Sequence, residues 1–177
     1  MMNAAGLESI YWVLTWLCHR SCAHCYDERF RPYRRDETER MLSESEALLP
    51  RIVANLPRTM QYEDGGTLHT GRIILAGGEL LLDGVRERLL YPTLSLLRER
   101  YAKVGGVRLV IQTTGDVIQP EHLEALRRLG VWMVTVSGID GFHKGLEEEA
   151  ERAALTTPSG AYRGNAERIG LDLSFAY

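Results

Sequence analysis

The sequence predicts an α/β protein built on a parallel sheet, and three observations support this. Apolar runs of strand length alternate with segments of helical periodicity, which is the pattern of βαβ units. Connections in such units are right-handed, so consecutive strands pair in parallel. Each of four runs ends in a short segment rich in Cys, Gly, Thr or Ser, as at the ligand-binding carboxyl ends of parallel strands. The 177 residues, 45% of them hydrophobic, predict a single domain over residues 1–177.

The first strand and the segment after it differ sharply in composition. Residues 10–17 (IYWVLTWL) are almost continuously apolar, which predicts a strand buried on both faces. Residues 26–39 mix basic and acidic residues without apolar periodicity, which predicts a loop. The arginines of this loop can hold a carboxylate or phosphate, although such mixed charge usually marks solvated surface. They are Arg29, Arg31, Arg34 and Arg35.

A helix and a second loop follow. Residues 43–56 repeat apolar residues at i, i+3 and i+4, which predicts a helix with one apolar face. Ser43 or Ser45 can cap its start, and Pro57 ends it. Residues 60–70 are polar and contain two adjacent glycines, which predicts a loop.

Two more strands enclose an interrupted helix. Residues 72–76 (RIILA) and 107–112 (VRLVIQ) predict strands. Residues 84–104 have helical periodicity, but Pro92 lacks an amide proton and either breaks this helix or begins a second one. We predict a short helix to about Leu90 and a longer helix through Tyr101, with Pro92 in its first turn.

The remaining elements continue the alternation. A helix is predicted over residues 120–129, between Pro120 at its start and Gly130 at its end. Residues 131–136 (VWMVTV) predict a fourth strand, and residues 171–176 (LDLSFA) predict either a fifth strand or a tail.

The three cysteines of the chain, Cys18, Cys22 and Cys25, lie within eight residues directly after the first predicted strand. An odd number of cysteines leaves one unpaired, so they do not form a disulfide framework. Thiolates this close together can ligate one soft metal centre. A cubic iron–sulfur cluster usually takes four thiolates, so three would leave one iron open to a ligand from outside the protein.

Two other structures are compatible with three thiols. Buried cysteines can be inert and need no metal. A zinc ion can be bound by a Cys3His set, with His19 or His24 as the fourth ligand. Structural zinc sites usually pair two short ligand knuckles across a spacer, and this chain has one, which favours iron–sulfur.

The C-x3-C-x2-C spacing after a strand resembles the radical S-adenosylmethionine (radical SAM) enzymes, whose signature is C-x3-C-x-aromatic-C; His24 holds the aromatic position. The resemblance implies that Cys18, Cys22 and Cys25 bind a [4Fe-4S] cluster and that SAM chelates its fourth iron. It also implies an electron donor such as flavodoxin or ferredoxin. In this family the cluster cleaves SAM, and the 5′-deoxyadenosyl radical takes a hydrogen atom from the substrate.

The segment Gly77-Gly78-Glu79 is similar to the GGE element of the family, which binds the amino group of SAM. Paired glycines allow a close approach of the backbone to a ligand. The family often continues with proline, whereas this chain has Leu80. The resemblance implies that Gly77, Gly78 and Glu79 contact the cofactor.

Two later segments extend the resemblance. Thr113-Thr114-Gly115 is similar to a T-N-G segment, with Thr114 as a departure, and implies a cofactor contact for Thr113. The segment from Ser137 to Asp140 and Gly141 is similar to the S-x-D-G stretch of radical SAM enzymes that modify peptides. It implies that Ser137 and Asp140 lie near SAM, and it favours a peptide or protein as the substrate.

Composition limits the class of partner and the compartment. The net charge of −3 gives no reason to expect binding to nucleic acid or to an anionic membrane. The apolar runs are too short to span a bilayer, and residues 1–10 lack the pattern of a signal peptide. Cysteines kept as thiolates imply a reducing compartment, so we expect a cytoplasmic protein.

The resemblance covers residues 8–145 and implies a parallel-stranded partial (β/α) barrel of the radical SAM type, incomplete at the C-terminus. The family core has six βα units, and this chain has room for four and part of a fifth. We expect the N-terminal part of a longer protein; a reduced barrel is the alternative. Two other functions remain open, a non-catalytic iron–sulfur or zinc module that binds a partner and an inactive fragment.

Overall fold

The computed structural model describes residues 6–22, 25–137, 148–150 and 172–176, with only the backbone of Ser137 and of residues 172–176. Its strands form one parallel sheet in the order β1-β4-β5-β6-β7. They are β1 (Ser9–Thr15), β4 (Arg72–Gly77), β5 (Arg108–Thr113), β6 (Val131–Ser137) and β7 (Asp172–Ala176). All lie within two residues of the predicted runs, and the last run is a strand. The predicted parallel α/β architecture is confirmed.

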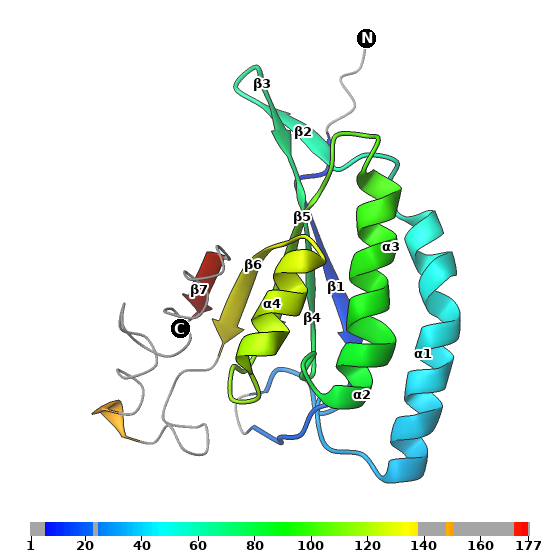
Figure 1. The fold of residues 1–177 in the computed structure, drawn as a ribbon, viewed down its shortest axis with the longest axis vertical. Helices are drawn as coiled ribbons and strands as arrows, with labels where there is room; N and C mark the ends of the chain where they lie inside the picture. Colours follow the sequence, from blue (N-terminus) through cyan, green and yellow to red (C-terminus); the bar gives the residue numbers. More distant parts are fainter. Residues whose placement is uncertain (1–5, 23–24, 138–147, 151–171, 177) are drawn as a thin grey trace.

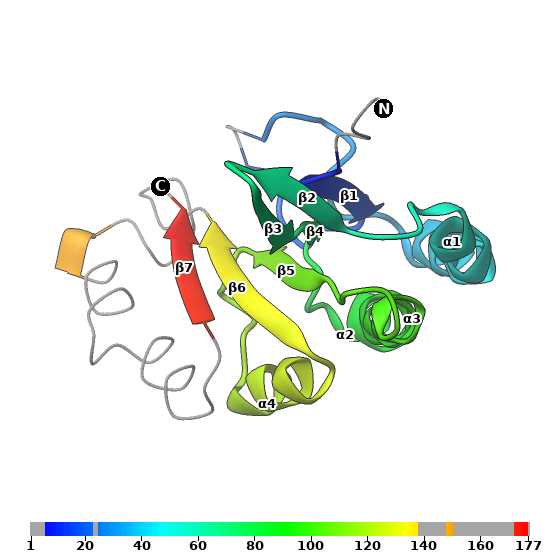
Figure 2. The same ribbon diagram turned by 90° about the horizontal axis from the view of Figure 1, so that it is seen from above.

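The helices lie on one side of this sheet (Figures 1 and 2). They are α1 (Arg35–Asn55), α2 (Asp83–Val85), α3 (Tyr91–Tyr101) and α4 (Pro120–Arg128), with a π-helical turn η1 (Arg86–Leu90) between α2 and α3. The strands follow one another in chain order, so right-handed connections carry every crossover helix to the same face. A doubly wound sheet would reverse direction and place helices on both faces.

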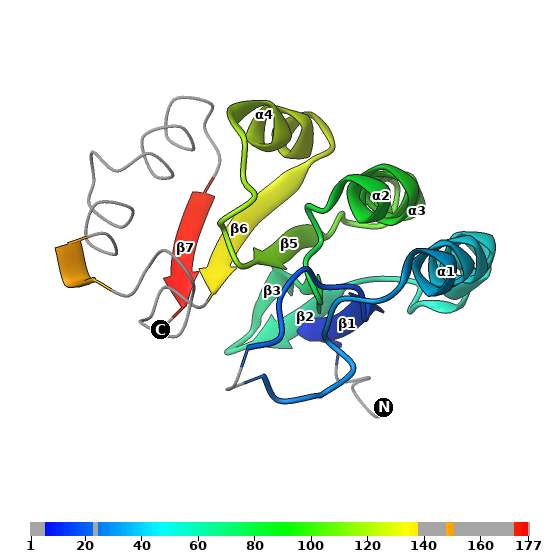
Figure 3. The ribbon, with the colours of Figure 1, turned by 90° about the horizontal axis from the view of Figure 1, so that it is seen from below.

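The sheet curves, with α1, α3 and α4 around its outside (Figure 3). This is the arrangement of one sector of a (β/α) barrel. Within the described ranges β1 pairs only with β4, and β7 pairs only with β6, so the sheet is open there. The partial barrel therefore stays a prediction.

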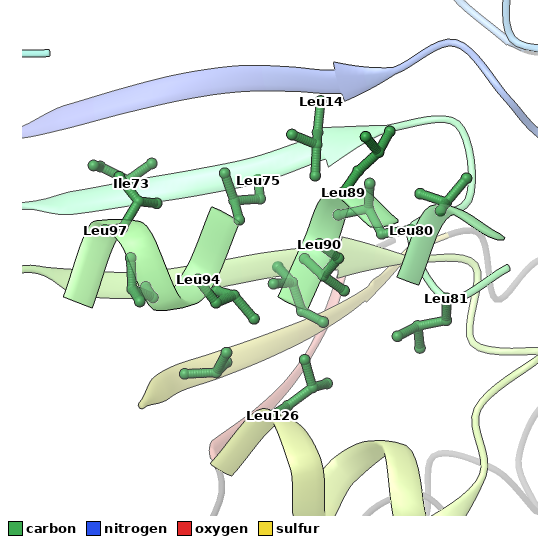
Figure 4. Packing of buried hydrophobic residues seen from close by; sticks show 14 of the residues in the cluster. Leu14, Ile73, Leu75, Leu80, Leu81, Leu89, Leu90, Leu94, Leu97 and Leu126 are labelled. Atoms are coloured by element: carbon green, nitrogen blue, oxygen red, sulfur yellow. The ribbon is translucent and has the colours of Figure 1, made fainter. Parts of the chain in front are cut away.

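The hydrophobic core lies between the sheet and these helices. Ile73 and Leu75 of β4 face Leu94 and Leu97 of α3 (Figure 4), and all four side chains are fully buried. Because side chains alternate along a strand, Ile74 points to the opposite face of the sheet. Burial of each aliphatic side chain stabilises the folded state by about 1.5–3 kcal/mol. This leucine-rich layer thereby holds together the strands whose carboxyl ends carry the loops.

Helix α1 begins at Arg35, eight residues before the predicted start, so the prediction of a loop over residues 26–39 is wrong for its last part. The Glu37 carboxylate accepts a hydrogen bond of 3.3 Å from the backbone N–H of Arg34. Acidic residues in the first turn also stabilise the positive end of the helix dipole. The start of α1 is thus fixed by charged residues and not by apolar periodicity. Ser43 does not cap the helix, because it lies inside it and its hydroxyl bonds to Glu39. No described helix, α1 included, is long and apolar enough to cross a membrane.

The prediction of a loop over residues 60–70 is also wrong, because this segment forms a hairpin. It consists of β2 (Gln61–Asp64) and β3 (Thr67–Thr70) in antiparallel pairing. Gly65 and Gly66 have φ angles of 54° and 80°, as a tight two-residue hairpin turn requires. The hairpin lies beyond the amino ends of the parallel strands (Figure 1), away from the loops at their carboxyl ends.

Pro92 lies in the first turn of α3, which ends at Tyr101, so the predicted place of Pro92 at the start of a second helix is confirmed. The backbone N–H of Tyr91 bonds to the carbonyl of Arg86, five residues earlier, which is the spacing of a π-helix. This wide turn leads directly into the first turn of α3, where the missing N–H of Pro92 is tolerated. The two predicted helices are therefore one continuous rod with a π-helical turn.

Candidate metal and cofactor site

The carboxyl ends of three neighbouring strands bring the predicted segments to one edge of the sheet (Figure 3). Strand β1 leads into the cysteine loop (residues 18–25), β4 into the glycine turn (Gly77-Gly78-Glu79), and β5 into residues 113–116. Strand β6 ends at Ser137, whose side chain is not described. His24 and Asp140 lie outside the described residues, so their predicted roles stay predictions.

The cysteine loop is tied to the body of the protein at its base. The backbone N–H of Cys18 donates to the carbonyl of Arg31 at 3.3 Å, and Leu17 forms a parallel bridge with Arg31. Further along, the N–H of Cys25 donates to the carbonyl of Cys22 at 3.0 Å. None of the three cysteines forms a disulfide among the described residues, and each is partly exposed. The described part of the loop therefore carries three partly exposed thiols that lie close together in the sequence.

The pKa of the Cys18 thiol is raised, chiefly because burial disfavours the thiolate. Hydrogen bonds from the backbone at Arg20 and His19 oppose this shift, whereas the negative charges of Glu79 and Cys22 add to it. A metal ion displaces the proton of such a thiol, and N–H groups directed at sulfur are among the features that tune iron–sulfur clusters. The two N–H groups thus favour a thiolate at Cys18, whereas its burial and the neighbouring negative charges disfavour one that has no bound cation.

The donor set fits a thiolate-bound metal centre by its chemistry. A cavity of about 170 Å³ lies beside Cys18 and is lined mainly by apolar residues, among them Leu17 and Leu42. The Nδ1 atom of His19 is buried and has no hydrogen-bond partner among the described residues. Within the same residues, no three His, Cys, Asp or Glu side chains are gathered as ligands around one point. The thiols would have to converge when a metal binds.

The glycine turn packs directly on the base of the cysteine loop. The N–H of Gly78 donates to the carbonyl of Thr15, and that of Glu79 donates to the carbonyl of Leu17, both at 2.9 Å. A Cβ atom on Gly78 would lie 1.9 Å from the Leu17 oxygen, and Gly77 has a φ of 140°. The two glycines are therefore needed for contact between these two loops, whereas their predicted contact with SAM stays a prediction.

Glu79 joins β4 to β5. Its side chain is 0% exposed. One carboxylate oxygen, Oε1, accepts bonds of 2.8 Å from the Leu81 N–H and the Thr113 hydroxyl. The other, Oε2, accepts bonds of 2.8 Å from the Thr114 N–H and hydroxyl. The carboxylate is thus fully engaged by the protein, and direct contact between this carboxylate and SAM, which the resemblance implies, stays a prediction.

Asp116 is a residue of the site that the sequence analysis misses. Its Oδ2 atom lies 2.6 Å from Nε2 of His19, and it accepts bonds from Nη2 (2.6 Å) and Nε (2.9 Å) of Arg20. Its Oδ1 accepts a bond from the hydroxyl of Thr114, which also reaches Glu79. A hydroxyl has one hydrogen, so Thr114 donates to one carboxylate at a time. Asp116 therefore joins the end of β5 to the cysteine loop.

The pKa of Asp116 is lowered to about 2. Burial alone would raise it, but hydrogen bonds from Thr114, His19 and Arg20 outweigh this effect. Asp116 is then an acceptor only at neutral pH, so His19 must carry a hydrogen on Nε2. A signal for this residue exists in the sequence, since an arginine inside the cysteine loop needs an acidic partner and Asp116 directly follows the Thr-Thr-Gly segment.

A second polar pair lies on the face of the sheet that points away from the helices. Tyr11 neighbours Trp12, which pairs with the helix-facing Leu75, so Tyr11 points to the opposite face. Its hydroxyl donates a bond of 2.6 Å to Oε1 of Gln112, and the tyrosine is 53% exposed. This pair presents hydrogen-bonding groups close to the strand ends.

No protein-family model matches the chain, and no curated protein matches it. Two similar solved structures are those of anSMEcpe, a radical SAM enzyme. Native anSMEcpe with bound AdoMet has a TM-score of 0.55 at 15% identity, over 96% of this chain and 43% of that one. Native anSMEcpe with bound AdoMet and Kp18Cys peptide has a TM-score of 0.53 at 16% identity, over 94% and 42%. The chain thus spans less than half the length of these structures, and over most of its own length it shares the fold of a radical SAM enzyme.

Proposed function

We propose that this chain forms a radical SAM enzyme core within one domain. Cys18, Cys22 and Cys25 bind a [4Fe-4S] cluster in this proposal. The glycine turn, Thr113, Ser137, Asp140 and His24 surround the bound SAM. Cluster and SAM together supply a 5′-deoxyadenosyl radical that abstracts a hydrogen atom from the substrate.

The observation that carries the proposal is the direct packing of the glycine turn on the cysteine loop. Bonds of 2.9 Å join Gly78 to Thr15, the last residue of β1, and Glu79 to Leu17, the residue before Cys18. A ligand that the glycine turn holds by its polar end would therefore lie beside the cysteines.

The residues of the chain have distinct tasks in this proposal. The thiols lose their protons to bind iron, and the N–H groups at His19 and Arg20 stabilise the sulfur of Cys18. Glu79 fixes the glycine turn against β5 and brings negative charge close to the ammonium group of SAM. The sheet and its loops keep water away from a reactive intermediate.

The substrate in this proposal is a peptide or a protein. The segment from Ser137 to Asp140 supports it, as does the fold shared with anSMEcpe, which has been solved with AdoMet and the Kp18Cys peptide. Tyr11 and Gln112 provide hydrogen-bonding groups on the sheet face that such a substrate would meet. We also propose an electron donor such as flavodoxin or ferredoxin and a reducing, cytoplasmic setting.

A second candidate is a zinc module, and His19 favours it. Metal-bound histidines usually donate their other ring N–H to a carboxylate. The pair of His19 Nε2 and Asp116 at 2.6 Å has this form, and the Nδ1 atom is buried without a described partner. With three thiols this atom would complete a Cys3His set.

Metal content separates the two candidates. The chain is reconstituted anaerobically with iron and sulfide, in parallel with zinc, and the bound metal is measured together with the visible and EPR spectra. We expect four irons per chain and a cluster EPR signal after reduction, both lost in Cys22→Ala because two thiolates do not hold a cluster. Stoichiometric zinc, with no iron retained, would replace the enzyme proposal by the zinc module; His19→Ala would then release the zinc.

A further inference from the structure

Asp116 connects two loops that are far apart in the sequence. It lies 96 positions from Arg20 and 97 from His19, yet it bonds to both at 2.6 Å. Two nitrogens of the Arg20 guanidinium, Nε and Nη2, donate to the same oxygen of Asp116, Oδ2, so this contact is a charge-assisted one. These bonds fix the first half of the cysteine loop, between Cys18 and Cys22.

The ion pair between Arg20 and Asp116 is partly shielded from solvent. The side chains of Arg20 and Asp116 are 16% and 23% exposed, whereas the exposed ion pairs of surface loops contribute little. Of the two ring nitrogens of His19, Nε2 bonds to Asp116, and Nδ1 has no partner among the described residues. Nε of Arg20 also lies 3.2 Å from Nε2, so Asp116, at the shorter distance, orients this imidazole together with Arg20.

The other side of Asp116 reaches the glycine turn. The hydroxyl of Thr114 lies between the carboxylates of Asp116 and Glu79, and the Thr114 N–H also bonds to Glu79. A displacement of either carboxylate would change the hydrogen bonds of Thr114. The cysteine loop and the glycine turn are thus linked twice, once by backbone contact and once through this chain of side chains.

We propose that Asp116 is a positioning residue: through Arg20 and His19 it holds the cysteine loop in the shape that accepts the cluster, and through Thr114 it couples that shape to the SAM-binding turn. The inference rests on the proposed function of the same site. Groups that orient metal ligands typically change metal affinity or activity 10–100-fold when they are removed. Asp116 is expected to act on the cluster in this way without touching it.

The first measurement uses the apo protein and needs no cluster. Hydrogen–deuterium exchange of a peptide over residues 18–25 is followed in wild type, Asp116→Asn and Arg20→Gln, together with the melting temperature. A matched control is Asp27→Asn, which removes a carboxylate that also pairs with an arginine, Arg29 at 2.5 Å, beside the same loop. We expect at least about 10-fold faster exchange of this peptide in Asp116→Asn and Arg20→Gln only. Unchanged exchange in both would overturn the positioning role.

The second measurement uses the reconstituted protein. Iron retention against a chelator and the EPR spectrum of the reduced cluster, with and without SAM, are compared for the same variants and for the double variant Asp116→Asn/Arg20→Gln. We expect Asp116→Asn to weaken iron retention about 10–100-fold and to diminish the SAM-induced spectral change. If Asp116 acts through Arg20, the double variant loses no more than the stronger single variant, because coupled sites are not additive. Additive losses, or a wild-type spectrum in Asp116→Asn, would contradict the proposal.

These readouts distinguish failure of the inference from failure of the proposed function. A wild-type protein that binds no iron contradicts the proposed function, and the exchange of the apo loop still decides whether Asp116 positions it. If Asp116→Asn does not fold, Arg20→Gln removes the same ion pair and leaves Asp116 bonded to His19 and Thr114. A wild-type response of Arg20→Gln in both measurements then refutes the proposal.

Discussion

The backbone nitrogen of Glu79 donates a hydrogen bond of 2.9 Å to the carbonyl oxygen of Leu17, the residue before the first cysteine. The bond places the end of β4 against the beginning of the cysteine loop. Any change that separates these two backbones is expected to disturb both segments of the candidate site together.

Substitution Gly78→Ala tests this contact. A Cβ atom would lie 1.9 Å from the Leu17 oxygen, so the two loops must move apart. We expect a loss of about 1–3 kcal/mol in the free energy of unfolding, as for overpacked sites, together with lower iron retention. Urea unfolding and reconstitution measure the two effects.

Gly66→Ala is the matched control for this substitution. Gly66 has a φ of 80° but no atom within 4 Å of an added Cβ. We expect it to cost about 1–2 kcal/mol through backbone strain alone and to leave iron retention unchanged. Equal iron retention in Gly78→Ala and Gly66→Ala would show that the contact between the glycine turn and the cysteine loop is not needed for iron binding.

Substitution Glu79→Ala removes the acceptor that joins β4 to β5. Buried donors at Leu81, Thr113 and Thr114 would lose their partner. Each such donor costs about 1–3 kcal/mol, so we expect a loss of about 3 kcal/mol or more in unfolding free energy, and weaker SAM binding. Calorimetric titration with SAM and urea unfolding check this, with the exposed Glu63→Ala as control. Wild-type stability with weak SAM binding would instead assign Glu79 to the cofactor alone.

The pH dependence of stability reports on Asp116. Its pKa is lowered from 3.8 to about 2, so its contribution is present above about pH 4 and is lost as the pH falls towards 2. We expect wild type to be more stable than Asp116→Asn at pH 5 and this difference to shrink between pH 4 and pH 2. Asp27 also has a pKa of about 2, but it is present in both proteins and its contribution cancels. A difference independent of pH would contradict the ionised network.

Thr114→Val tests the hydroxyl between the two carboxylates. Among the hydrogen bonds that lower the pKa of Asp116, the one from Thr114 has the largest effect on that pKa. We expect this pKa to rise towards its ordinary value in Thr114→Val and to stay low in Thr114→Ser, which keeps the hydroxyl. Carbon-detected NMR titration of the Asp116 carboxyl group measures both. The same low pKa in Thr114→Val would remove Thr114 from the network.

The strands and the edge of the sheet that carries the site are predictable because their signals are local. Continuous apolar runs define β1, β4, β5 and β6, and the topology of parallel strands places the segments after them together. The start of α1 at Arg35 and the β2–β3 hairpin are missed because charged and polar residues form them without apolar periodicity.

The network around Asp116 is missed for a different reason. Its partners lie 96 and 97 positions away, so the place of Asp116 directly after the Thr-Thr-Gly segment points to the residue but not to its pairing with His19 and Arg20. The same holds for Glu79, since a GGE segment predicts a contact with a ligand but not the donors that β5 provides from 34 and 35 positions away. Long-range polar contacts of this kind depend on the folded sheet.

The measurement that tests the central claim most directly is the formation of 5′-deoxyadenosine. The anaerobically reconstituted chain is reduced with dithionite in the presence of SAM, and the product is measured by mass spectrometry. We predict that 5′-deoxyadenosine forms with the wild-type chain and is absent with Cys18→Ala, Cys22→Ala or Cys25→Ala. A chain that holds a full cluster and binds SAM but yields no 5′-deoxyadenosine above the level of these three variants would contradict the account.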